Sequence, residues 1–212
     1  MIVEFDKVSS EDWGLKLYEF QAPPPELRTS YVDVPFRDGL LDFSTALTGG
    51  IMRYKNRTVT LSFDYVGNWE DWFQASSEIN AALHGQKTRI QLDIDPDYYY
   101  LGRCQLSGTK DNMALGSITI TADCDPYKYK VNPTVREFDV SGNLEITLQN
   151  DRMPTIPTVT TDAEITVEFG ESTIVFQAGT RKAPDLLLLE GANHMTLTGT
   201  GHIKFEYQEG AL

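Results

Sequence analysis

The chain has 212 residues, of which 41% are apolar and 11% aromatic, enough to bury a core in one large domain or two small ones. Its net charge of −13 argues against a protein that grips nucleic acid, because phosphate binding needs clustered Lys and Arg. Residues 1–130 carry 13 basic and 19 acidic side chains (net −6), and residues 131–212 carry 5 and 12 (net −7).

The first six residues contain neither a basic start nor an apolar run, and the aliphatic stretch at 186–189 lies between two acidic residues. We therefore expect no secretion signal and no membrane-spanning segment, but a soluble protein that begins in a cytoplasm. In that compartment Cys104 and Cys124 are expected to be buried thiols rather than a disulfide or a metal pair.

Alternation of apolar and polar residues with a period of two predicts a mainly β protein. The clearest case is residues 58–65, in which every second side chain is apolar. The strands predicted in the first part are 2–5, 15–20, 30–34, 58–65, 88–94, 98–106 and 117–122. Residues 35–56 lose the pattern, and a loop of that length predicts a functional arm.

One helix interrupts these strands. Asn68 can cap its first turn, and Gly85 supplies a stop at its C-terminal end. The apolar residues that recur near helical spacing are Trp69, Trp72, Phe73, Ile79 and Leu83. We expect this stripe to pack the helix onto a sheet rather than to form a ligand site.

The pattern changes after Tyr129, and residues 131–134 are predicted to be a linker. Turn residues then separate short extended runs, which predicts a small β-sandwich without a helix. The predicted strands are 136–140, 144–148, 158–160, 163–169, 172–177, 186–189, 193–198 and 202–207. The last two are expected to form a hairpin around residues 199–201, with Leu197 facing Ile203 and Met195 facing Phe205.

The residues that could carry chemistry form no catalytic or metal-binding motif. Residues 93–97 resemble the start of a calcium-binding loop, but Tyr98 and Cys104 stand where that loop needs Gly and Glu. In the predicted hairpin His194 and His202 would lie on the order of 13 Å apart along the strands, too far for one zinc ion. They and His84 are expected to be surface residues.

No nucleophile elbow, phosphate loop or dinucleotide fingerprint is present. The sequence therefore predicts a protein that is not an enzyme, with no catalytic residue, no cofactor and no metal.

Two segments, 93–100 and 123–129, each combine an acidic residue and Pro with tyrosines close behind. Asp and Pro are common turn residues, so these segments are expected to be turns at strand ends. Tyr98, Tyr99 and Tyr100 fit a strand that is packed on both sides, or one at a subunit contact, better than a platform for stacking sugars. They are the candidate subunit-interface residues.

The order of these features resembles the distal tail protein (Dit) family of long-tailed, non-contractile (siphovirus-type) phages. The features are the helix, the strand that ends at 92–97, the next strand that begins at 98–102 and the strand end at 121–127. The ending at 203–210 also resembles that family, so the resemblance spans the whole chain. It implies that residues 1–130 form an N-terminal β-rich ring-forming domain with one helix. Residues 131–212 would then form a small galectin-like β-sandwich.

The resemblance further implies a structural protein at the tail tip of a virion, encoded by a phage or prophage of Gram-positive bacteria. It would be assembled in the cytoplasm of the host. The expected partners are five further copies in a hexameric ring, the terminal-ring protein of the tail tube, the tail-associated hub protein and, in some phages, receptor-binding or baseplate proteins. DNA would pass through the central channel without specific binding, and no membrane is involved.

The alternative is a carbohydrate-binding β-sandwich module that acts in host-surface adhesion. Lectins of this outline commonly stack sugar on an aromatic such as Trp. Trp13, Trp69 and Trp72 all lie outside residues 131–212. For that part of the chain we therefore expect protein docking rather than glycan binding.

Overall fold

The computed structural model describes residues 1–6, 8–110 and 115–212, which form two compact units, Met1–Lys128 and Tyr129–Leu212. Each unit has its own core of buried apolar side chains. The predicted fold class, mainly β with one α-helix, is confirmed. In the part of the chain that is described, no helix is long and apolar enough to cross a membrane.

The first unit is built on an antiparallel sheet with the strand order β2-β1-β7-β8-β9-β6-β3. Its strands are β1 (Val3–Phe5), β2 (Val8–Ser9), β3 (Leu15–Gln21), β6 (Arg57–Val66), β7 (Lys87–Leu92), β8 (Tyr98–Lys110) and β9 (Leu115–Cys124). A short 3-10 helix, η1 (Ser10–Trp13), joins β2 to β3. The predicted strands of this part are therefore present, with β8 longer than expected.

Strand β6 shows why this sheet has an apolar face. Val59, Leu61 and Phe63 are fully buried, as their alternation predicts. Burial of each such side chain contributes on the order of 2 kcal/mol. Helix α1 (Trp69–Leu83) covers the same face, with Trp72 packed edge-on against Tyr65 at 5.5 Å.

The helix begins and ends as predicted, but its apolar stripe is narrower. The Asn68 side chain accepts a hydrogen bond from the Asp71 backbone N–H, and the helix stops before Gly85, which has a positive φ of 76°. Trp72, Ile79 and Leu83 are buried. Trp69 and Phe73, predicted to pack on the sheet, are instead 41% and 65% exposed. The spacing of the apolar residues alone did not indicate which side of the helix is covered by the sheet.

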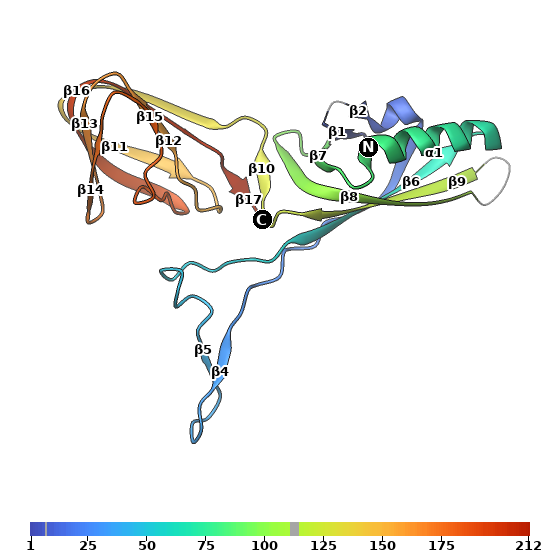
Figure 1. Ribbon diagram of the computed structural model, residues 1–212, viewed down its shortest axis with the longest axis horizontal. Helices are drawn as coiled ribbons and strands as arrows, with labels where there is room; N and C mark the ends of the chain where they lie inside the picture. Colours follow the sequence, from blue (N-terminus) through green and yellow to red (C-terminus); the bar gives the residue numbers. More distant parts are fainter. Residues whose placement is uncertain (7, 111–114) are drawn as a thin grey trace. The chain divides into compact units, whose positions relative to one another are not determined.

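The segment predicted as an arm at 35–56 is longer than expected. Within the described residues, strands β4 (Tyr31–Asp33) and β5 (Leu40–Asp42) pair with each other and with no other strand, in a ribbon separate from the main sheet (Figure 1). The strand predicted at 30–34 thus belongs to the arm, and we define the arm as residues 26–56. None of these residues is buried.

The second unit is arranged around one long strand pair, β11 (Thr134–Asn150) and β16 (Gly191–Tyr207). The two strands are antiparallel and pair without a register shift over their full length. The other edge of β16 pairs with β12 (Thr158–Thr161) and β13 (Ile165–Phe169). The remaining strands are β14 (Ser172–Phe176) on β13, β15 (Gly179–Arg181) on β12, and β10 (Lys128–Lys130) paired with β17 (Gly210–Ala211).

The predicted hairpin around residues 199–201 is wrong, as is the break predicted between the strands at 136–140 and 144–148. Gly142 and Gly199 are paired partners within continuous strands, and both have positive φ. A Cβ on Gly199 would lie 2.8 Å from the Glu164 carbonyl, and one on Gly201 would lie 2.6 Å from an Asp162 oxygen. These glycines therefore let the strand pass close under the β12–β13 connection rather than reverse direction.

The strand predicted at 186–189 is also wrong, and β15 was not predicted. Leu186 and Leu188 are fully buried, but a single bridge from Leu188 to Thr155 is the β pairing seen in this stretch of the described chain. The buried Asn193 side chain accepts from the Leu189 N–H and donates to its carbonyl. Side-chain amides here take the place of a strand partner.

Candidate functional site

The first acidic-Pro segment is a turn between β7 and β8, as predicted. The Asp95 N–H donates to the Leu92 carbonyl at 3.1 Å, and the Tyr98 N–H donates to the Asp95 carbonyl at 3.2 Å. The Asp95 carboxylate forms an ion pair with Lys128 at 2.6 Å. Among the described residues, no group of three or more His, Cys, Asp or Glu could hold a metal ion.

Each of the three candidate tyrosines has a cation from the same chain over its ring. Tyr99 and Tyr100 are both 8% exposed, whereas Tyr98 is half-buried. The ring-to-cation pairs are Tyr98 with Lys128 (4.5 Å), Tyr99 with Arg89 (4.8 Å) and Tyr100 with Arg57 (5.2 Å). The ring of Tyr100 also packs against Phe20 at 6.2 Å. The tyrosines therefore form part of the internal packing, and their role at a subunit contact stays a prediction.

Arg57, which sequence reasoning missed, joins Tyr100 to the base of the arm. Its side chain is 6% exposed, and Nη2 donates to the Ala22 carbonyl at 2.7 Å. Ala22 follows β3 and Arg57 begins β6, so the guanidinium holds together the two ends from which the arm departs. A signal was present, because Arg57 falls in the same alternation as Val59 and Leu61.

The two cysteines are buried free thiols, as predicted. Burial is the main cause that raises the pKa of Cys104 to about 11. Burial, together with the neighbouring Cys104, raises the pKa of Cys124 to about 12. Neither thiol is therefore a nucleophile at neutral pH.

The histidines lie apart in the structure. His194 shares a hydrogen bond with the Thr147 hydroxyl at 2.9 Å. His202 contacts Asp139 at 2.9 Å, and this hydrogen bond raises the pKa of His202. Both belong to β16, so the geometry predicted for them across a hairpin is wrong. His84 accepts a hydrogen bond from the Leu106 N–H at 3.1 Å at the end of the helix.

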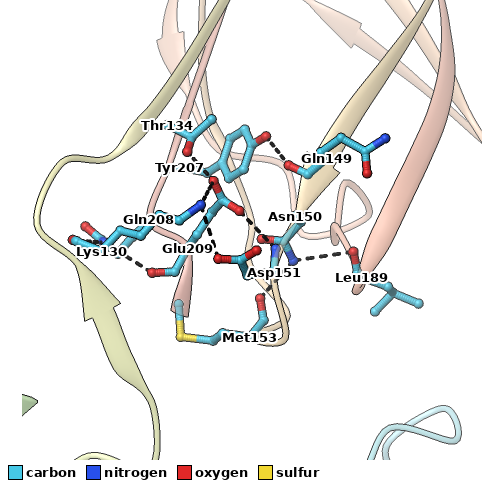
Figure 2. A network of polar contacts seen from close by, with 10 residues as sticks. All are labelled: Lys130, Thr134, Gln149, Asn150, Asp151, Met153, Leu189, Tyr207, Gln208 and Glu209. Carbon is cyan, nitrogen blue, oxygen red and sulfur yellow. Dashed lines mark hydrogen bonds and ion pairs between the residues drawn. The ribbon is translucent and has the colours of Figure 1, made fainter. Parts of the chain in front are cut away.

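A buried carboxylate organises the end of the second unit (Figure 2). The Glu209 side chain is 7% exposed and accepts from the Lys130 ammonium at 2.9 Å and the Asp151 backbone N–H at 3.0 Å. The Thr134 hydroxyl donates to the same carboxylate. Burial opposes protonation of Lys130, but its hydrogen bonds to Glu209 and Asp151 outweigh burial and raise its pKa.

Backbone bonds complete this network around Glu209. The Gln208 side-chain amide donates to the Lys130 carbonyl at 2.6 Å, and the Lys130 N–H donates to the Glu209 carbonyl at 3.0 Å. The Met153 N–H donates to the Gly210 carbonyl at 3.0 Å. The last residues of the chain thus hold together its entry into the second unit and the turn after β11 (Figure 2).

A groove of about 590 Å³ lies on the second unit, over β11, β13 and β16. Its lining contains Glu145, Glu168 and His194 but no Trp, Tyr or Phe. Polar groups could bind hydroxyls, but the groove offers none of the large aromatic rings on which sugars commonly stack.

The arm carries a separate pocket of about 550 Å³, lined in part by Phe43, Leu47, Arg28 and Arg53. The Arg28 N–H donates to the Arg53 carbonyl at 2.8 Å, so the two arginines are neighbours across the arm. At its base the arm has an exposed ion pair between Glu26 and Lys55 at 2.9 Å.

No protein-family model matches this sequence, and no curated protein matches it. A solved structure is similar in fold: the Dit protein (gp 19.1) of phage SPP1, described as a paradigm of the hub adsorption apparatus in phages that infect Gram-positive bacteria. The TM-score is 0.71 at 15% identity, and the match covers 98% of each chain. The resemblance in fold predicted from the sequence is therefore confirmed.

Proposed function

We propose that this chain is a distal tail protein, a structural component of a phage tail tip rather than an enzyme. The observation that carries the proposal is the match in fold to SPP1 Dit over 98% of both chains, since it includes both compact units. A shared fold alone leaves function open. The order of turns and strands in the sequence independently favours the same family.

In this proposal residues 1–130 form a hexameric ring and residues 131–212 form a peripheral galectin-like domain. The arm supports assembly, because none of its 31 residues is buried and a partner would cover its exposed apolar side chains. A neighbouring copy in the ring is the partner we propose. Tyr98 is the candidate tyrosine with most surface left for a subunit contact.

The charge of the chain suits a channel that DNA crosses without binding. A net charge of −13 repels phosphates rather than holding them. The ring would join the terminal ring of the tail tube to the tail-associated hub protein and, in some phages, to receptor-binding or baseplate proteins. The protein would be assembled in the host cytoplasm and reside at the virion tail tip.

Negative-stain imaging of the purified protein, alone and with its neighbours in the tail, tests the proposal. Rings with a central hole are the expected result. Their absence under both conditions would contradict it.

A deletion tests the arm. The bond between Arg28 and Arg53 allows residues 29–52 to be replaced by a two-residue Asn-Gly turn without disturbing the base of the arm. We expect this variant to fold and to lose the ring. An unchanged hexamer, measured as mass in solution, would remove the arm from the proposal.

The alternative, a carbohydrate-binding module for host adhesion, has one observation in its favour, the polar groove over β11, β13 and β16. The absence of Trp, Tyr and Phe from the lining of this groove favours protein docking for the second unit. Binding of that unit to a glycan array, abolished by Glu145→Gln and Glu168→Gln together, would reverse this choice.

A further inference from the structure

The N-terminal end of helix α1 presents an aromatic surface that the chain covers only in part, with the Lys110 ammonium 5.5 Å from the centre of the Trp69 ring. Trp69 and Phe73 are 41% and 65% exposed, and their rings lie 6.1 Å apart. From residue 66 to residue 86 the sequence contains three carboxylates, at Glu70, Asp71 and Glu78, and no Lys or Arg. Lys110 adds one cation here, since its ammonium donates to the Gly67 carbonyl at 2.7 Å. Three carboxylates against this one ammonium leave the end of the helix aromatic and acidic on balance.

The pocket of the arm has the complementary character. Its apolar lining includes Leu47, which is 99% exposed, and Phe43, which is 43% exposed. Arg28 and Arg53 line it as well, and no carboxylate does. Within the described part of the chain, neither guanidinium forms an ion pair. The pocket thus offers apolar area and two cations available for a carboxylate.

We propose that the pocket of the arm in one copy receives the N-terminal end of helix α1 of a second copy. Trp69 and Phe73 would cover Leu47 and Phe43, and Glu70 would face the two arginines. Aromatic side chains and Arg are enriched at the centres of protein interfaces, and charge complementarity fixes the register of docking. This inference rests on the proposed function, because it names the surface that the arm engages in the ring.

A second copy of the chain suits the pocket because every chain carries both the pocket of the arm and the N-terminal end of α1, and the two are not joined within one copy. Among the described residues, no hydrogen bond, ion pair or ring contact links residues 28–53 to α1. A contact between different patches on two copies is heterologous and closes into a ring when the rotation allows. Docking of this kind therefore agrees with a cyclic assembly.

Disulfide trapping tests the contact. Leu47→Cys protein is mixed with Phe73→Cys protein under mild oxidation, and the mixed disulfide is measured by mass spectrometry. The control replaces Phe73→Cys with Ile94→Cys, since Ile94 has a matched exposure of 64% on the same unit. Cys104 and Cys124 are buried, with pKa values of about 11 and about 12, and do not compete. Docking raises the effective concentration of the two thiols, so trapping at position 73 should be at least about tenfold faster than in the control.

Charge exchange provides a second, independent readout. Glu70→Arg should slow the trapping between positions 47 and 73, and Arg28→Glu with Arg53→Glu on the arm partner should restore it. Equal trapping at positions 73 and 94, or no response to the charge changes, would overturn the inference. If rings form in negative stain while the trapping fails, the docking is wrong and the proposed function stands. If no rings form with the tail partners, the proposed function itself fails.

Discussion

The tyrosine block at 98–100 and the arm at 26–56 both combine aromatic side chains with arginines, yet they differ in what their rings contact. In the block, cations of the same chain cover all three rings, and Tyr99 and Tyr100 are 8% exposed. In the arm, the Tyr54 ring packs against Tyr127 at 5.7 Å, but the Phe36 ring is fully exposed. Both regions have the composition of an interface, and the arm leaves more of its aromatic surface exposed. The comparison moves the expected subunit contact from the tyrosines towards the arm.

Truncation of one ring from each region should give the largest difference. Tyr100→Ala should lower the free energy of unfolding by about 3 kcal/mol, because it leaves a cavity beside Phe20 and removes the ring over which Arg57 lies. Phe36→Ala should change it by less than about 0.5 kcal/mol, since the side chain is fully exposed. Urea denaturation measures both values. Equal losses would mean that the arm packs within its own chain.

The rate of thiol labelling provides a second comparison between the buried sheet and the arm. At pH 8 Cys104 and Cys124 should react at least about a hundredfold more slowly than the added thiol of Leu47→Cys, because burial keeps them protonated and out of contact with the reagent. A thiol whose folded-state pKa is raised gains thiolate only as pH climbs, so reactivity of the native cysteines should increase towards pH 11. Fast labelling of the unchanged protein at pH 8 would contradict the burial.

The second unit allows a matched test of a buried charge against a free one. Glu209→Gln should lower the free energy of unfolding by about 2 kcal/mol, because the bonds from Lys130 and Asp151 lose their charged acceptor. Glu171→Gln, at an exposed turn position, serves as the control and should have an effect near zero. Thermal unfolding of both variants measures the difference. A similar loss in the two would show that the network does not stabilise the unit.

The smallest effect is expected from two lysines. Lys128→Met should cost about 1 kcal/mol, because this lysine pairs with Asp95 and covers the ring of Tyr98. Lys55→Met removes the Glu26 pair in the arm, whose two side chains are 57% and 76% exposed, and should leave the stability unchanged within error. The Lys128 effect should persist in 0.5 M salt to a larger extent than the Lys55 effect. A larger cost for Lys55 would reverse the comparison.

Much of the first unit followed from local patterns. The alternation around Val59 and Phe63 predicted β6, and the Asn68 cap predicted the start of α1. What failed there depended on neighbours distant in sequence. The same spacing that buries Trp72 leaves Phe73 exposed, because the covered sector of the helix is set by the sheet beneath it.

The candidate site was predictable only in part for the same reason. Tyr98, Tyr99 and Tyr100 were visible as an aromatic run, and the turn before them was correct. The cations over their rings come from Arg57, Arg89 and Lys128, which lie far apart in the sequence. An aromatic run indicates an interface when its rings are free, and the sequence does not record which rings are already covered.

Local periodicity and residue chemistry were enough to predict the mainly β class, the single α-helix, the buried thiols and the turn before Tyr98. The path of Gly199 to Gly201, which continue a strand rather than reverse it, depends on contacts with residues distant in the sequence. A glycine with positive φ serves a turn or a close crossing equally well. The choice was made here by the β12–β13 connection, which comes too close to β16 to leave room for a Cβ.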